Sequence, residues 1–483
     1  MDNGVLCVYA RDLLKTWEEF FSWVRENEKR HLLLLRDESD TPPFFLLTDP
    51  QVHILSVDAD DELVKQKLWE FLFLPFSYRA LGKEEKGGES HFARIERLRR
   101  GIHLVASDYR DMGKRVLANL LANFSQLGSA KRGKDLFGRF QGVPALICGA
   151  GPSLETEIEE IRRWENRALI FAGGASLNAL AASSLRPDFT AALDPHPSPE
   201  RFLRQAAFEI PFFYQSRVAN ELLSSIQAPR LWVPDSGGYP LETWMHERAG
   251  LDEPPFDAGW NVSTFCTALA AAMGCNPIIF VGLELSTRSE QVYARGIDEK
   301  IGKEFVEAFD VAGEKVYTKQ DWLMAESWLE KFVKDHPDHL FLNATQGGLP
   351  LSSITRMPLK EAREIYGQET RDLKGLVHSV LAPLQTSAAA ADVRQIGDEI
   401  KKSFEKCEEL CIKLFTLLEK SYANLPGING ETALYEVELE EEIAYKTFLA
   451  PLWEIWKPLF LREAKEMDSA LHRLVFFRRL LLN

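Results

Sequence analysis

The 483-residue sequence has little cysteine, no long apolar run and no excess of basic residues. Its six cysteines are scattered, and only Cys407 and Cys411 lie close together, with no histidine beside them. Neither a disulfide framework nor a zinc site is therefore predicted. No apolar run approaches the roughly 20 residues that cross a bilayer, and residues 1–21 lack the regions of a secretory signal. These absences predict buried or inert thiols in a cytoplasmic chain without a membrane span.

The charge balance is acidic, with 72 Asp and Glu against 57 Lys and Arg and a net charge of -15. This excess argues against a nucleic-acid surface. A small anionic ligand remains compatible with it, because a local site can be positive within an acidic protein. The composition, 45% hydrophobic and 27% charged, is that of a folded chain. Its length predicts two or three domains.

Three patterns divide the chain at about residues 110 and 355. In 1–110, short apolar runs between turn-rich segments, followed by a helical pattern, predict a small N-terminal α/β domain. In 111–355, a helical connector leads into apolar runs that alternate with helices, which predicts a mostly parallel sheet covered on both faces. Residues 356–483 predict an α-helical domain; the final stretch, 468–483, suits a helix of that bundle or, alternatively, a membrane-surface helix. The expected strands of the central sheet are 144–149, 167–174, 188–194, 210–216, 230–234 and 276–282.

The stretch LICGAGPSLETEIEEI, residues 146–161, is typical of a strand end, a tight turn and an amphipathic helix. Gly149 and Gly151 permit the sharp turn and the close approach of a ligand. Pro152 suits a first helical turn, and Ser153 offers a hydroxyl there. The stretch matches neither the dinucleotide fingerprint nor the P-loop. It predicts an anion site built from backbone N–H groups at a helix N-terminus, with a structural tight turn as the alternative.

Two further turns follow the next expected strands. Gly173 and Gly174 again open a helix, and Asp194 ends its strand just before His196. If these strands are neighbours, Asp194 lies near the first turn, where a carboxylate can hold a ribose hydroxyl, a metal or an amine. Capping the next turn is the alternative for Asp194, and an exposed loop position is the alternative for His196.

The last block is AGWNVSTFCTALAAAMGCNPIIFVGLELS, residues 258–286. Asn261, Ser263 and Thr264 stand just before a helix of small residues, where they supply an N-cap and hydrogen bonds to a ligand. The following strand brings Glu284 to its carboxyl end. Glu284 is a candidate general base or metal ligand, or a structural carboxylate.

Six blocks in order resemble the motility-associated-factor family, which shares a central domain with the MptE-like 6-hydroxymethylpterin diphosphokinases. The resemblance covers about residues 110 to 355, and two positions depart from it: Glu284 stands where the family has aspartate, and Asn261 where a second glycine is more usual. The matching blocks are GAGPSL (149–154), PDFTAALDP (187–195), VSTFCTALAAAMGCNPIIFVGLELS (262–286), YARG (293–296), KVYT (315–318), and WLEKF with FLNATQGGLPL (341–351).

The resemblance implies an α/β fold with a Rossmann-like, sialyltransferase-type central sheet. Bacterial three-part members are regarded as glycosyltransferases that attach nonulosonic (sialic-like) acids to flagellin Ser or Thr, whereas small archaeal members transfer diphosphate from ATP to a pterin alcohol. Because this chain has segments on both sides of the shared domain, the leading hypothesis is transfer from a CMP-activated donor to Ser or Thr of a flagellin-like or other surface protein.

Under this hypothesis no metal is obligatory, since helix N-termini and hydroxyls can stabilise a CMP leaving group. Residues 149–153 would bind donor phosphate or ribose, and Asn178 and Asn261 would contact the nucleotide. The base would be Asp194, His196 or Glu284. One alternative is a Mg²⁺-dependent diphosphokinase with Asp194 and Glu284 on the metal; another is a catalytically silent interaction module.

Overall fold

The computed structural model forms two compact units. One comprises Met1–Asp111 with Leu452–Phe476, and the other Met112–Pro451 with Phe477–Asn483. The division into three domains, with boundaries at about residues 110 and 355, stays a prediction. The structure describes residues 4–9, 12–37, 42–80, 85–196, 208–235, 239–251, 253–288, 301–302, 304–422, 429–463 and 477.

The N-terminal unit is the small α/β domain that the sequence predicts. Four parallel strands lie in the order β3-β2-β1-β4, and α1 begins at a cap in which Asp12 accepts a hydrogen bond from the Lys15 amide at 3.0 Å. The apolar run at 44–48 forms a single helical turn after Pro43. The elements are β1 (Gly4–Tyr9), α1 (Leu13–Arg25), β2 (Arg30–Arg36), α2 (Phe44–Leu47), β3 (Val52–Ser56), α3 (Asp61–Trp69) and β4 (Phe76–Ala80).

The expected helical connector is α4 (Glu85–Phe124), a helix of 40 residues. Its C-terminal part belongs to the second unit, where two amide side chains hold neighbouring loops. Asn119 donates to the carbonyls of Pro195 and Arg217 at 2.9 and 3.1 Å. The fully buried Asn123 donates to those of Ser216 and Val218. The loops that follow two strands of the central sheet are therefore held by this helix.

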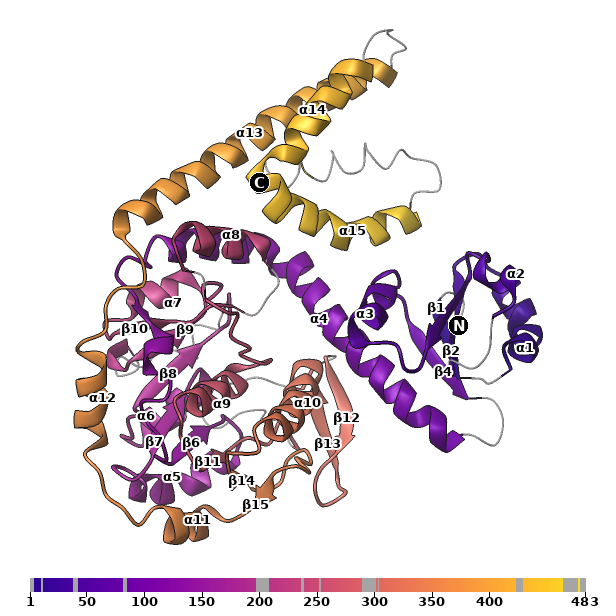
Figure 1. Ribbon diagram of the computed structural model, residues 1–483. Coiled ribbons are helices and arrows are strands. Elements are labelled where there is room, and N and C mark those ends of the chain that lie inside the picture. Colours follow the sequence, from indigo (N-terminus) through magenta and orange to yellow (C-terminus); the bar gives the residue numbers. More distant parts are fainter. Residues whose placement is uncertain are drawn as a thin grey trace. The chain divides into compact units, whose positions relative to one another are not determined.

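The central sheet of the second unit has nine strands in the order β15-β14-β11-β6-β7-β8-β9-β10-β5, and every neighbouring pair is parallel (Figure 1). All six strands expected from the apolar runs are present. The strands missed are β5, β14 and β15, which have only two or three residues each. The bounds are β5 (Lys131–Arg132), β6 (Ala145–Cys148), β7 (Leu169–Ala172), β8 (Phe189–Ala192), β9 (Phe212–Tyr214), β10 (Arg230–Trp232), β11 (Ile278–Val281), β14 (Phe341–Asn343) and β15 (Thr355–Arg356).

Helices cover both faces of this sheet, as predicted. Leu154, Ile158 and Ile161 of α5 (Ser153–Arg163) are buried, while Phe265 and Leu269 of α9 (Val262–Ala272) belong to the main core with alternate strand residues. From β6 the chain runs through α5 to β7 on one side, yet β11 pairs with the other side of β6. The strand order thus reverses between β6 and β11, and the carboxyl ends of these strands are where ligands bind in such sheets.

The remaining described elements surround the sheet or extend from it. An antiparallel hairpin, β12–β13, precedes α10, and Arg248 of α8 pairs with Glu399 of α13 at 3.0 Å. Apart from Phe477, the stretch 468–483 lies outside the described residues. The elements are η1 (Gly133–Leu136), α6 (Ala175–Ala182), α7 (Asn220–Ser225), α8 (Pro240–Arg248), β12 (Phe305–Phe309), β13 (Lys315–Lys319), α10 (Gln320–Asp335), α11 (Leu359–Tyr366), α12 (Leu373–Leu381), α13 (Ala390–Tyr422), α14 (Asn429–Glu441), a π-helical turn (Tyr445–Leu449) and α15 (Ala450–Glu463).

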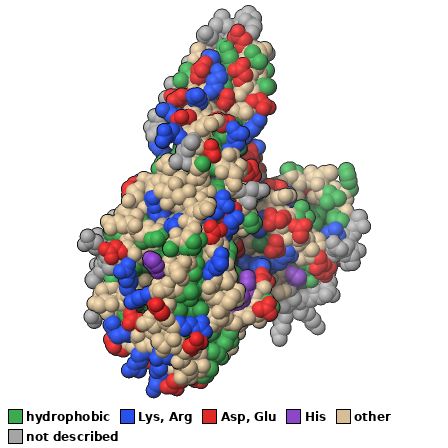
Figure 2. All heavy atoms as spheres, turned by 60° about the vertical axis from the view of Figure 1, so that its left-hand side comes forward, with side chains coloured by type: hydrophobic (Ala, Val, Ile, Leu, Met, Phe, Trp, Pro, Cys, Tyr) green, Lys and Arg blue, Asp and Glu red, His purple; other side chains and the backbone are tan. Residues whose placement is uncertain are grey.

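The cysteines match the sequence expectation. All six cysteines are buried and free, and burial raises the pKa of the Cys148 thiol to about 12. Acidic and basic side chains are interspersed over the face shown in Figure 2. Within the described part of the chain, no helix is both long enough and apolar enough to cross a membrane.

Candidate functional site

A cavity of about 160 Å³ lies at the carboxyl edge of the central sheet. Its walls come from the ends of β6, β7, β8 and β11 and from the starts of α6, α9 and α10. The structure therefore brings together turns that lie up to about 170 residues apart in the sequence. The predicted residues in the wall are Gly151, Gly173, Gly174, Asp194, Asn261, Ser263 and Glu284.

The N-terminus of α5 is covered by a carboxylate from the chain itself. The backbone N–H of Ser153 donates to Glu284 Oε1 at 2.8 Å. A Cβ built on Gly151 would lie 1.6 Å from Glu284 Oε2, and one on Gly149 would lie 2.2 Å from the Gly282 carbonyl oxygen. These glycines are thus required by the close approach of the loop after β11. The Glu284 carboxylate therefore occupies the anion site that the sequence predicts at this helix N-terminus.

The loop after β11 is held in an unusual backbone conformation on either side of Glu284. Gly282 has φ of 65° and Leu285 has φ of 52°, and a positive φ is uncommon for a residue such as leucine. The carbonyl of Glu284 accepts from the Leu349 amide at 2.8 Å, and the Leu283 amide donates to Thr345 Oγ1 at 3.0 Å. The segment after β14 therefore fixes the loop that delivers Glu284. Such local strain is typical of functional sites.

Burial governs the protonation of Glu284. Its side chain is 8% exposed, and this burial raises the pKa of the carboxyl above its ordinary value, while hydrogen bonds from Ser153 act in the opposite direction. The raised pKa favours the neutral acid. An ionised Glu284 would nevertheless lie where the helix dipole stabilises negative charge.

The N-terminus of α6 faces the cavity directly. Gly174 has φ of 56°, and a Cβ built there would meet no atom within 4 Å. Gly173 is required by packing, since its Cβ would lie 2.2 Å from Val262 Cγ1. The first N–H groups of a helix have no acceptor within the helix, so Gly174 and Ala175 present donors to the cavity wall.

The three predicted residues at the N-terminus of α9 differ in their roles: some stabilise the helix start and some line the cavity. Asn261 Oδ1 accepts from the Thr264 amide at 2.9 Å, which confirms Asn261 as the N-cap. Thr264 is fully buried; its Oγ1 accepts from the amides of Trp260 and Asn261 and donates to backbone carbonyls. The structure assigns Thr264 to this capping box, not to ligand contact. Ser263 lines the cavity.

Two further acidic groups complete the wall. Asp194 follows β8, next to Pro195, whose carbonyl is held by Asn119 of α4. Asp321, in the first turn of α10, was missed by the sequence reasoning. Burial raises the pKa of Asp321; the nearby charge of Asp194 raises it further, and Lys319 acts against this. The local signal was a helix start in "TKQDW", which does not distinguish a cap from a site.

The other predicted residues lie outside the wall of the cavity. His196 is exposed, Pro152 is exposed at the start of α5, and Asn178 is buried in the second turn of α6. Among the described residues, no group of three His, Cys, Asp or Glu side chains is arranged to hold a metal ion.

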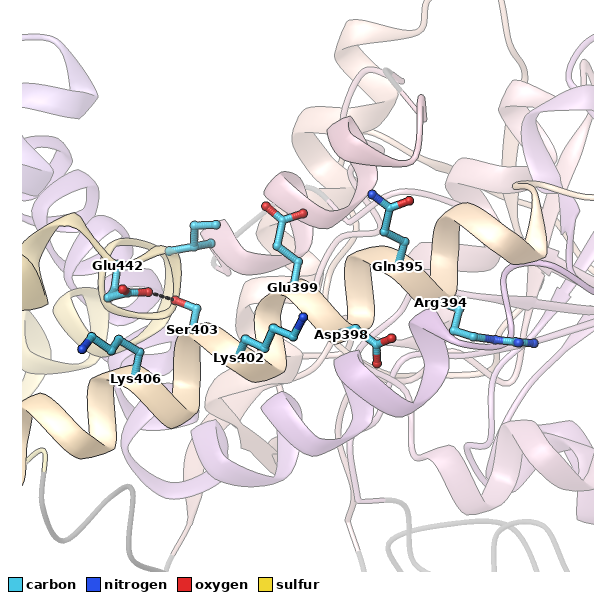
Figure 3. Close-up of a pocket in the computed structure, with 9 residues that line it drawn as sticks. Arg394, Gln395, Asp398, Glu399, Lys402, Ser403, Lys406 and Glu442 are labelled. Atoms are coloured by element: carbon cyan, nitrogen blue, oxygen red, sulfur yellow. Dashed lines mark hydrogen bonds between the residues drawn. The ribbon is translucent and has the colours of Figure 1, made fainter.

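A larger cavity, of about 800 Å³, lies along α13 (Figure 3). Ser403 Oγ donates to Glu442 Oε2 at 2.6 Å and accepts from the Ala444 amide at 3.0 Å, so the wall ties α13 to the segment before the π-helical turn. The wall carries equal numbers of basic and acidic side chains. They are Arg394, Lys402 and Lys406 against Asp398, Glu399 and Glu442.

Comparison with known proteins agrees with the fold. Residues 118–290 match the family model described as 6-hydroxymethylpterin diphosphokinase MptE-like. The chain is similar to the solved structure of MAf glycosyltransferase from Magnetospirillum magneticum AMB-1, with 15% identity and a TM-score of 0.60 over 99% of this chain and 77% of that chain. No curated protein matches it. The predicted resemblance is confirmed at the level of the MptE-like domain and of the fold.

Proposed function

We propose that this chain, which carries an MptE-like domain within a fold shared with a MAf glycosyltransferase, is a nucleotide-sugar-dependent glycosyltransferase. The observation that carries the proposal is the cavity at the carboxyl edge of the sheet, where two helix N-termini meet three carboxyl groups. The sugar would be a nonulosonic acid on a CMP carrier, and the acceptor a Ser or Thr of a flagellin-like or other surface protein, as the resemblance implies.

The donor phosphate is assigned to the N-termini of α6 and α9. Gly174, Ala175 and Ser263 line the cavity, and backbone N–H groups and hydroxyls at helix N-termini bind and stabilise phosphate charge. The α5 terminus is excluded from this role because Glu284 occupies it. At about 160 Å³ the cavity is smaller than the pockets that hold a whole ligand. It therefore receives the phosphate and the adjoining part of a sugar.

The base is assigned to the pair Asp194 and Asp321. Their charges interact, and the raised pKa of Asp321 suits a group that takes up a proton. In the transfer, the acceptor hydroxyl forms the new glycosidic bond to the anomeric carbon as the bond to the carrier phosphate breaks. The hydroxyl proton passes to the carboxylate, and the electron pair leaves with the nucleotide.

The diphosphokinase remains the second candidate because of the same two carboxyl groups. Carboxylates in a cavity wall can also bind phosphates through a bridging cation, and Mg²⁺ with two carboxylates and ATP phosphates is such an arrangement. Asp194 and Asp321 suit such a role better than the pair Asp194 and Glu284, since Glu284 is engaged by Ser153.

Calorimetric binding of CMP, CDP, ATP and GTP to the full chain, with and without Mg²⁺, separates these functions. Metal-independent CMP binding that weakens on Ser263→Ala but persists in Ser153→Ala supports the glycosyltransferase and the assigned phosphate position. Binding of ATP only with Mg²⁺ would replace it with the diphosphokinase. Absence of binding by all four nucleotides would leave the silent interaction module.

A further inference from the structure

A second acidic cavity, of about 760 Å³, lies at the carboxyl ends of β9 and β10, beside α8. It is separate from the site described above and shares no wall residue with it. Four prolines, Leu251, Tyr239 and Trp244 make its apolar walls. Its acidic groups are Asp235, Glu242, Glu247 and Glu253.

Glu242 carries an unsatisfied acceptor in this wall. The residue is 4% exposed, and its Oε1 has no hydrogen-bond partner among the residues that the structure describes. Hydrogen bonds from Ser216 reach the carboxyl group, and His246 Nε2 is 3.8 Å from Oε1. When Glu242 is ionised, its buried oxygen without a donor costs free energy, and a bound donor would remove that cost.

The other charges around Glu242 leave the cavity negative. Burial lowers the pKa of His246 to about 3, so its ring is neutral at physiological pH. Glu253 is neutralised by Lys134 at 2.8 Å and by Arg132 at 3.7 Å. Arg217, in the loop after β9, is the cation that acts on Glu242, while Asp235 adds negative charge. Glu247 is exposed at the rim.

We propose that this cavity binds a primary alkylammonium group, with Glu242 Oε1 as the acceptor for its N–H donors. A compact cation with three donors satisfies the buried oxygen, and its alkyl chain packs on the proline walls. Arg248 lies over the Trp244 ring at 5.9 Å, so this ring serves as part of the apolar wall. The ammonium is that of a lysine side chain in a polypeptide or of a free diamine. The proposal does not depend on glycosyl transfer.

Binding should depend on pH in a direction set by Glu242. Burial, then the charge of Asp235, raises the pKa of Glu242 to about 8, against the effect of Ser216 and Arg217. Tyr214 also interacts with it and has a raised pKa, so it stays neutral. A cation binds the carboxylate and not the acid. Affinity therefore rises between pH 7 and pH 9 as Glu242 ionises.

The test is calorimetric titration of the full chain at pH 9 with 1,5-diaminopentane and with Nα-acetyl-lysine N-methylamide, against pentan-1-ol. Glu242→Gln keeps the shape of the side chain and mimics its protonated form, and should weaken amine binding at least about tenfold. Glu247→Gln, the matched control on the same helix, removes an exposed charge and should weaken it less than about threefold.

Binding of either amine with this difference between the variants supports the proposal, and the better ligand tells which source of ammonium the cavity prefers. Equal binding by wild type and Glu242→Gln overturns it, as does the absence of binding by both amines or equal binding of pentan-1-ol. If Glu242→Gln fails to fold, the pH dependence of amine binding by the wild type is the test. An affinity that does not rise between pH 7 and pH 9 then contradicts the role of Glu242.

Discussion

Gly151 lies against Glu284 so closely that a Cβ on it would be 1.6 Å from Oε2 and 2.4 Å from Cδ. Gly151→Ala must therefore displace a buried carboxylate from the N-terminus of α5. We expect a loss of about 2–4 kcal/mol in the free energy of unfolding, because overpacking and a lost buried hydrogen bond add together. Urea denaturation measures this.

The double variant Gly151→Ala with Glu284→Ala should recover part of that loss, because the clash disappears with the carboxylate. Gly397→Ala is the matched control: it lies within α13, where a Cβ meets nothing within 4 Å, so the change should stabilise by up to about 1 kcal/mol. Strictly additive losses for Gly151 and Glu284 would show that the two positions do not interact.

The free energy of unfolding should depend on pH through the side chain of Asp188. Its Oδ2 accepts from the Ile170 amide at 2.8 Å, yet burial raises its pKa from 3.8 to about 6. Between these values the folded chain holds a proton that the unfolded chain has lost, so stability falls as pH rises. From pH 4.5 to pH 7 this costs about 2 kcal/mol.

Asp188→Asn keeps an acceptor for Ile170 and removes the titration. The difference in unfolding free energy between wild type and Asp188→Asn should therefore shift by about 2 kcal/mol over that interval, with the variant gaining as pH rises. A difference that stays constant from pH 4.5 to pH 7 would mean that the folded carboxyl titrates as it does in the unfolded chain.

At the scale of elements, two adjacent residues at the start of α9 have different roles, one in stability and the other in binding. Thr264 Oγ1 accepts from the amides of Trp260 and Asn261 at 2.9 and 3.0 Å, so Thr264→Val leaves both donors buried and should destabilise by about 2–4 kcal/mol. Ser263→Ala should change stability by less than about 0.5 kcal/mol. Thermal melts and nucleotide titrations of both variants check this; an equal loss of stability would contradict the division of roles.

The elements that the sequence predicts well are those whose burial is complete. Six strands of the central sheet are continuous apolar runs because both faces are covered, and that pattern needs no partner to be recognised. Strands β5, β14 and β15 are too short to show a period. The hairpin β12–β13 has no apolar run on either strand to mark it.

The site was predictable in its place but not in its contacts. Parallel strands bring their carboxyl ends to one edge, so the glycine turns, Asp194 and Glu284 could be placed there from the sequence. The pairing of Glu284 with Ser153 joins residues 131 positions apart, and no local pattern encodes it. For the same reason Asp321, which reaches the cavity from the start of α10, was missed.

At the scale of the whole molecule, the two units have separate hydrophobic cores. Leu34 is fully buried in the core of the first unit and Ile147 in that of the second. Units with their own cores unfold as separate transitions unless an interface couples them. Scanning calorimetry should therefore resolve two transitions, with Leu34→Ala lowering one and Ile147→Ala lowering the other by the loss of about 2–5 kcal/mol that such truncations cause.

A nucleotide bound at the carboxyl edge of the central sheet should stabilise only the transition that Ile147→Ala identifies. Ligand at 100 times its dissociation constant adds about 2.7 kcal/mol to the stability of the unit that binds it, because the ligand binds only the folded state. The cavity is lined by residues of the second unit alone, so the first transition should not move. A scan of wild type and both variants, with and without CMP, measures each shift. Equal shifts of both transitions would mean that α4, which runs through both units, transmits the stabilisation, and a shift confined to the first would place the nucleotide elsewhere.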